Sequence, residues 1–167
     1  MQNLVQKNYT LAEENARTIM LVTFIIKNEL FGIDVMKVHE IIGMVNITPI
    51  PDAVDYLRGV INLRGKVVPV IDIRTRFRLD QIEYNQNTVI LIVEIKNKSI
   101  GLIVDAVSDV IDISEDMIND YSDLDSGIKS NLIKSIVNYN DSLILILDTE
   151  RIINDEALKI IQENTDI

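Results

Sequence analysis

Residues 24–42 of the chain read FIIKNELFGIDVMKVHEII, and residues 93–111 read VEIKNKSIGLIVDAVSDVI. The two stretches align without a gap, so that Gly32 corresponds to Gly101. In both of them, short runs rich in Ile and Val are separated by turn residues, a pattern typical of β-strands. The stretch at 24–42 therefore predicts a set of strands that the chain builds twice.

A second block repeats in the same order. Residues 57–77 read LRGVINLRGKVVPVIDIRTRF and match residues 133–153, which read IKSIVNYNDSLILILDTERII. The second copy is longer between its two blocks, and we assign the extra length to a loop at 119–131, which is rich in turn residues. Chance similarity between strands could produce one such block, but two blocks in one order indicate an internal duplication.

The apolar runs predict a mostly β fold. Each is short enough to be a strand, and we expect strands at residues 19–27, 30–35, 44–50, 59–62, 66–73, 88–96, 99–104, 110–113, 132–139 and 142–147. The two copies predict lobes at about 18–80 and 86–153, within one domain that spans 18–153. A lobe of this size has a marginal core, so the lobes should pack together. Closing each set of about five strands into a small barrel would remove exposed edges.

Both copies end on an aspartate followed by a short segment with helical spacing. Asp72 and Asp148 each follow an apolar strand, where a carboxylate can accept hydrogen bonds from the free N–H groups of a helix start. We therefore expect two N-caps there, not catalytic groups. Pro69 cannot donate to a strand ladder and should lie at a sheet edge or a bulge.

The last residues, 154–167, predict a C-terminal amphipathic helix. Asn154 or Asp155 is the expected cap, and Leu158 and Ile161 are expected to face inward. The helix and the two short capped segments are the only helices that the pattern predicts.

Composition narrows the possible partners. The net charge of −10 disfavours nucleic acid and anionic lipid, because both are bound mainly through Lys and Arg. Residues 1–17 form a polar N-terminal segment without the apolar core of a signal peptide. The longest apolar runs, at 20–26 and 143–147, are far shorter than the roughly 20 residues that span a bilayer. We expect a cytoplasmic protein without direct membrane insertion.

The residues that enzymes need are scarce or scattered. The chain has no Cys and a single His, which argues against disulfides, thiolate nucleophiles and zinc. His39 lies beside an apolar stripe and is expected on its solvated side. No Gly-rich phosphate loop or Ser nucleophile motif is found. We therefore expect no catalytic residues, no metal and no cofactor.

The tetrapeptide Asn62-Leu63-Arg64-Gly65 joins two expected strands. A compact hairpin connection needs positive φ, which Gly65 can supply. The equivalent positions in the second copy read Asn138-Tyr139-Asn140-Asp141, so the turn is kept but the arginine is not. Arg64 is therefore either a solvated charge at a turn tip or a binding residue, and the residues alone leave both open.

Three motifs resemble the CheW family, the coupling proteins of bacterial chemotaxis. They are residues 31–41 (FGIDVMKVHEI), residues 58–74 (RGVINLRGKVVPVIDIR) and residues 101–110 (GLIVDAVSDV). The resemblance covers roughly 18–153. It implies two packed SH3-like β-barrels that act as a non-enzymatic adaptor. In the family, this adaptor links the histidine kinase CheA to the cytoplasmic tips of transmembrane chemoreceptors and is recruited to membrane arrays through these partners.

The resemblance also implies a receptor-binding site. The family motifs fall on Val38, Glu40, Ile41, Gly59, Asn62, Leu63, Arg64 and Gly65. We expect Glu40 and Arg64 to form a salt bridge that orients the guanidinium, since Arg–carboxylate pairs can be bidentate. The regulatory domain of the kinase should pair barrel to barrel with this chain, through residues that the sequence does not identify.

Two alternatives remain at this point. The chain could be a CheW-like paralogue or module that serves another sensory array. It could also be a ligand-binding double barrel outside chemotaxis, which a deep pocket with converging carboxylates would favour.

Overall fold

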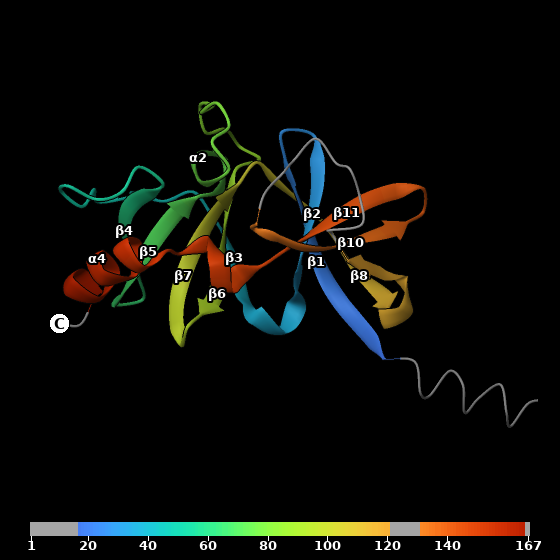
Figure 1. Cartoon of the computed structure of the whole chain (residues 1–167). Coiled ribbons are helices and arrows are strands. Elements are labelled where there is room, and N and C mark those ends of the chain that lie inside the picture. Colours follow the sequence, from blue (N-terminus) through green and yellow to red (C-terminus); the bar gives the residue numbers. More distant parts are fainter. Residues whose placement is uncertain (1–16, 121–130, 166–167) are drawn as a thin grey trace, which may run out of the picture.

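The computed structural model describes residues 17–120 and 131–165 and is mostly β, as expected. Two sheets account for the described strands (Figure 1). Sheet A has the order β8-β1-β2-β11-β10-β9. Its strands are β1 (Thr18–Ile26), β2 (Glu29–Asp34), β8 (Ala106–Ser114), β9 (Ile118–Asp120), β10 (Ile133–Tyr139) and β11 (Ser142–Leu147).

Sheet B has the order β3-β6-β7-β5-β4. Its strands are β3 (Val38–Gly43), β4 (Leu57–Leu63), β5 (Lys66–Asp72), β6 (Val89–Ile95) and β7 (Lys98–Val104). The described helices are short and lie outside the sheets: α2 (Ile73–Arg76), α3 (Thr149–Ile152), α4 (Asp155–Thr165) and the 3₁₀ turns η1 (Val35–Lys37) and η2 (Glu115–Met117).

The sheets exchange their first hairpins. β1 and β2 come from the first copy but complete sheet A, whereas β6 and β7 come from the second copy but complete sheet B. Each exchanged hairpin joins the other copy through a parallel pair, β2 with β11 and β7 with β5. In Figure 1 the blue β1 and β2 accordingly lie with the orange β10 and β11. The sheets therefore do not follow the expected lobe boundaries at 18–80 and 86–153, because each sheet needs strands from both.

The backbone of the two copies supports the duplication. Pairs of adjacent residues with positive φ, which form the tight turns of hairpins, recur at equivalent positions. Between the first two strands of each copy they are Lys27 and Asn28 (49° and 63°) and Lys96 and Asn97 (52° and 64°). Between the last two strands they are Arg64 and Gly65 (51° and 84°) and Asn140 and Asp141 (50° and 63°).

One expected strand is absent from the structure, and two of the described strands were not expected. Residues 44–50 were expected to form a strand, but only Thr48 pairs there, through an isolated bridge to Val60. Pro49 and Pro51 lack the N–H that a ladder requires, which explains the interruption. The strand at this point of the chain is instead β3, which begins at Val38, and the short β9 was not expected either.

The core is divided into three clusters. The largest, here called the central core, takes buried residues from both sheets and contains the stacked rings of Phe24 and Phe31, whose centroids are 5.9 Å apart. Two smaller clusters lie within sheet A and within sheet B, around Val137 and Val68 respectively. The two sheets therefore pack together as expected, with most of the apolar burial shared between them.

The expected helix caps are confirmed. Asp72 Oδ1 accepts a hydrogen bond from the N–H of Thr75, and Asp148 Oδ1 accepts one from the N–H of Glu150. Pro69 lies in β5, a central strand, and not at an edge; pairing with β7 begins one residue later, at Val70. A proline is tolerated there because the parallel ladder has not yet started.

The C-terminal helix is also confirmed over its described residues. The N–H of Ala157 donates to Asn154 Oδ1 at 2.8 Å, which makes Asn154 the cap. Ala157 and Ile161 are buried, and Leu158 packs against the central core. Of the expected loop at 119–131, the first two residues belong to β9, and 121–130 lie outside the described residues.

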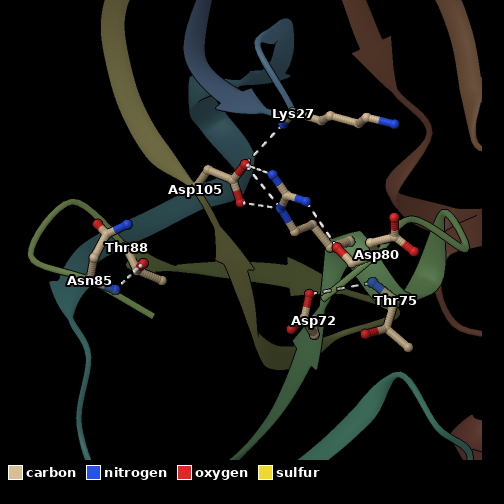
Figure 2. A network of polar contacts seen from close by, with 8 residues as sticks. Lys27, Asp72, Thr75, Asp80, Asn85, Thr88 and Asp105 are labelled. Carbon is tan, nitrogen blue, oxygen red and sulfur yellow. Dashed lines mark hydrogen bonds and ion pairs between the residues drawn. The ribbon is translucent and has the colours of Figure 1, made fainter. Parts of the chain in front are cut away.

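The ion pair between Arg74 and Asp105 links the hairpin of β1 and β2 to the elements that follow β5 and β7 of sheet B (Figure 2). Arg74 donates from Nε and Nη2 to the carboxylate of Asp105 at 2.8 and 2.7 Å, and from Nη1 to the carbonyl of Asp80. The same carboxylate accepts the N–H of Lys27, in the turn between β1 and β2. Burial raises the pKa of Asp105, but the hydrogen bonds from Arg74 and Lys27 outweigh it, so that the net pKa is lowered.

We predict that Asp105→Asn lowers the free energy of unfolding at neutral pH by roughly 1–3 kcal/mol. Because folding lowers the pKa of Asp105, its contribution is present above the ordinary carboxyl pKa and is lost as the pH falls through the folded value. Urea unfolding between about pH 7 and pH 3 should show the two proteins converging in acid. Asp112→Asn, at an exposed carboxylate in β8, is the control; an equal loss in both variants would contradict the prediction.

Candidate functional site

The expected site lies where the two edges of sheet B approach each other. Val38, Glu40 and Ile41 belong to β3 and the residues of the other motif to β4 and its turn, at opposite ends of the strand order. The sheet is nevertheless curled, since Ile42 of β3 and Leu63 of β4 pack against the same cluster. This curvature brings together two motifs that are distant in sequence.

Glu40 and Arg64 form the expected salt bridge across these edges. Arg64 Nη1 donates to Glu40 Oε2 at 3.2 Å, and Nη2 donates to Oε1. The hydrogen bond from Arg64 lowers the pKa of Glu40, and the carboxylate in turn raises the pKa of Arg64. The Arg64 side chain is 71% exposed, whereas that of Glu40 is 29% exposed. The guanidinium is therefore held in one orientation while it remains open to a partner.

A positive-φ backbone and a side-chain hydrogen bond define the turn that carries Arg64. Arg64 and Gly65 both have positive φ, at 51° and 84°, and Asn62 Oδ1 accepts the N–H of Gly65 at 2.8 Å. An added Cβ on Gly65 would meet nothing within 4 Å, so the glycine is there for its backbone conformation and not for space. The expected positive φ of Gly65 is confirmed.

Gly59 is placed differently from the other expected residues. It is buried, has φ of 147°, and an added Cβ would lie 2.0 Å from the carbonyl oxygen of Thr48. This close approach allows the bridge in which Thr48 and Val60 exchange hydrogen bonds of 2.8 and 2.9 Å. The structure therefore gives Gly59 a packing role, whereas we expected direct contact with a partner.

Exposed apolar residues flank the ion pair along the chain. Ile41 follows Glu40 and is 42% exposed, and Val67 follows the turn and is 43% exposed. His39 also faces solvent, as expected, and its Nε2 lies 3.3 Å from a carboxylate oxygen of Glu94. Consecutive side chains of a strand point to opposite faces of the sheet, so Ile41 lies on the other face of β3 from Glu40. Val67, by contrast, lies near Arg64, and an arginine beside an accessible apolar side chain is typical of a protein-binding surface.

In residues 17–120 and 131–165, no group of three His, Asp or Glu side chains could hold a metal ion. Within the same ranges, no helix is long and apolar enough to cross a membrane.

The fold and the site define a scaffold of two SH3-like β lobes with an ion-paired arginine on its surface. A family model, described as the CheW-like domain, matches residues 20–157. The chain therefore belongs to the CheW-like domain family of chemotaxis scaffolds.

Individual relatives agree. The chain is 30% identical over 138 residues to the chemotaxis protein CheW of Klebsiella aerogenes, with 83% of each chain covered. It is 32% identical over 151 residues to that of Treponema pallidum, covering 87% of this chain and 88% of the relative. The crystal structure of the scaffolding protein TtCheW from Thermoanaerobacter tengcongensis is similar with a TM-score of 0.79 and 35% identity, covering 84% and 96% of the two chains.

We predict that Gly59→Ala costs roughly 2 kcal/mol or more in the free energy of unfolding, because the new Cβ would overlap backbone atoms that cannot move independently. Gly43→Ala is the matched control: Gly43 ends β3 in the same sheet, has open space around it and should tolerate the methyl group. Urea denaturation measures both. Equal stability of the two variants would show that Gly59 is not required for the Thr48 bridge.

Proposed function

We propose that this protein is a non-enzymatic adaptor that couples transmembrane chemoreceptors to the histidine kinase CheA. The observation that carries the proposal is the bidentate pair between Arg64 and Glu40, which fixes an exposed guanidinium on a family scaffold. The pair lies at the motifs that the family resemblance assigns to receptor contact. The protein would work in the cytoplasm and reach the membrane through its partners.

The surface around the ion pair suits a receptor helix. Helices dock into grooves by apolar anchors, with polar groups that set the register. Val67, which is exposed and lies near the turn of Arg64, offers an apolar contact, and Arg64 offers directional hydrogen bonds. Asn62 and Gly65 would act indirectly, by shaping the turn, and Leu63 by supporting it from the sheet B cluster.

The kinase contact would use a different part of the scaffold. In the family, the regulatory domain of CheA resembles CheW itself, so the two would pair lobe to lobe. Simultaneous binding of receptor and kinase would let the receptor state alter kinase output, with no bond made or broken in this chain.

We predict that Arg64→Ala weakens binding to a soluble receptor cytoplasmic fragment by about tenfold, since an oriented charged hydrogen bond is lost. Arg78→Ala is the matched control, because Arg78 is also an exposed arginine with positive φ. Isothermal titration calorimetry measures the affinity, and circular dichroism checks the fold. Equal affinities for the two variants would remove Arg64 from the receptor site.

A charge swap separates recognition from local structure. The double variant Glu40→Arg/Arg64→Glu keeps opposite charges at the two positions but moves the guanidinium to β3. We expect it to retain the fold and to bind the receptor fragment as weakly as Arg64→Ala. Recovery of wild-type affinity would mean that the pair itself, and not the placed arginine, is required.

Coupling is tested by reconstitution of receptor membranes, CheA and ATP, with kinase phosphorylation as the readout. We expect phosphorylation to become dependent on the receptor only when this protein is added. Kinase output that is the same with and without the protein would contradict the proposed function.

A further inference from the structure

A cavity of about 260 Å³ lies at one end of sheet A. Strands β1, β2, β10 and β11 supply most of its lining, and the turns η1 and η2 and the start of α3 contribute to it. Its apolar lining residues Leu21, Ile33 and Ile146 are buried. None of the residues that we expect to contact a receptor lines it. The cavity is therefore a separate feature of the molecule, with a partly apolar wall.

A β-bulge in β10 brings two consecutive side chains to this cavity. Pairing with two adjacent residues of β11 runs from Ile133 directly to Ser135, so that Lys134 is the extra residue. Neighbouring residues of a regular strand point to opposite faces, yet Lys134 and Ser135 both line the cavity. Bulges commonly redirect side chains beside functional sites. Here the bulge places an ammonium group next to a hydroxyl.

The hydroxyl of Ser135 has no hydrogen-bond partner within the described part of the chain. Ser135 is only 7% exposed, and buried side-chain polar atoms usually have at least one partner. The other buried hydroxyl of the lining, that of Thr149, accepts Lys37 Nζ at 3.1 Å. The same ammonium lies 3.9 Å from a carboxylate oxygen of Glu150. Ser135 is therefore the buried polar group that the cavity leaves open to a ligand.

Two charged groups of opposite sign also line the cavity without a partner. Lys134 and Glu115 are exposed, and neither side chain forms an ion pair with another residue of the described ranges. The remaining charged lining residues are Lys37, which is paired, and Asp34, whose carboxylate accepts the N–H of Met36. One free cation and one free anion beside an apolar wall match the two charged ends of a small zwitterion.

The equivalent positions in sheet B show that the bulge does not require a free cation. Lys134 corresponds to Arg58, the extra residue of the bulge in β4. Arg58 Nη2 lies 3.7 Å from a carboxylate oxygen of the buried Asp72. The equivalent of Asp72 is Asp148, which pairs with Arg151 at 3.5 Å instead. Lys134 is therefore left without the internal carboxylate that its equivalent has.

The cavity itself has no counterpart at the equivalent positions of sheet B. Ser135 corresponds to Gly59, and Thr149 corresponds to Ile73. The carbonyl oxygen of Thr48 occupies the space beside Gly59, since an added Cβ would lie 2.0 Å from it. In sheet A the same backbone position has room for a side chain and for a cavity in front of it. The hydroxyls are therefore a feature of one copy and not of the fold.

We propose that this cavity binds a small aliphatic amino acid. The carboxylate of the ligand accepts hydrogen bonds from Lys134 and Ser135, its ammonium faces Glu115, and its side chain contacts Leu21 and Ile146. The volume is just below the range of about 300–1,000 Å³ that is typical of clefts for drug-sized ligands, which suits a smaller molecule. Binding at this place does not depend on receptor coupling.

A titration of the ¹⁵N-labelled full chain with L-valine tests the proposal. We expect saturable amide shifts at Glu115, Ile118, Lys134 and Ser135, and weaker binding at high salt. N-acetyl-L-valine lacks the ammonium and L-valinamide lacks the carboxylate, so each should bind roughly fivefold more weakly. The absence of shifts with L-valine would overturn the proposal. Equally tight binding of N-acetyl-L-valine N-methylamide would also overturn it, because the cavity would then accept a peptide segment.

Two variants assign the ends of the ligand. Lys134→Gln should weaken L-valine binding by roughly fivefold and change L-valinamide binding by less than about twofold, since L-valinamide has no carboxylate. Glu115→Gln should weaken L-valine binding but not N-acetyl-L-valine binding, which involves no ammonium. Ser135→Ala should weaken both ligands that carry a carboxylate.

Lys159→Gln is the matched control, because Lys159 is an exposed lysine of α4 outside the cavity. It removes the same charge as Lys134→Gln and should leave L-valine binding unchanged. Equal losses in these two lysine variants would overturn the proposal. An equal loss of L-valine and L-valinamide binding in Lys134→Gln would overturn the assignment of the carboxylate.

Discussion

The central core is the interaction on which the rest of the structure depends. Its stacked phenylalanines, Phe24 and Phe31, come from the hairpin that the first copy contributes to sheet A. Leu91 and Leu102, from the hairpin that the second copy contributes to sheet B, are buried in the same cluster. Because each sheet is completed by the other copy, neither half has a full set of strands alone. Each sheet therefore needs strands from both copies, although the chain is built from a duplicated plan.

This exchange also creates the site. After β2 ends in sheet A, the turn η1 crosses over and β3 enters sheet B, where Glu40 meets Arg64. The backbone is nearly symmetric between the copies, but the side chains are not. Arg64 corresponds to Asn140, and the ion-paired Asp105 corresponds to Met36, which is 84% exposed. The backbone of the turns is what the copies share, whereas the proposed binding role of Arg64 and the structural ion pair of Asp105 each belong to one copy.

Local features were predictable from the sequence, whereas the pairing of distant strands was not. Turn positions, caps such as Asn154 and the C-terminal helix depend on neighbouring residues, which the sequence displays. The hairpin exchange could not be predicted, because the alternation of apolar and polar residues in a strand is the same whichever sheet the strand joins. The packing role of Gly59 could not be predicted either, because it depends on the carbonyl oxygen of Thr48, in another segment of the chain.

We propose that receptor recognition is confined to the copy that carries Arg64. The most direct measurement is a titration of the ¹⁵N-labelled protein with a soluble receptor cytoplasmic fragment, followed by amide chemical shifts. We expect the largest changes on β3 and on the turn at Arg64, with the equivalent turn at Asn140 unchanged. Changes of equal or greater size at the Asn140 turn would contradict it.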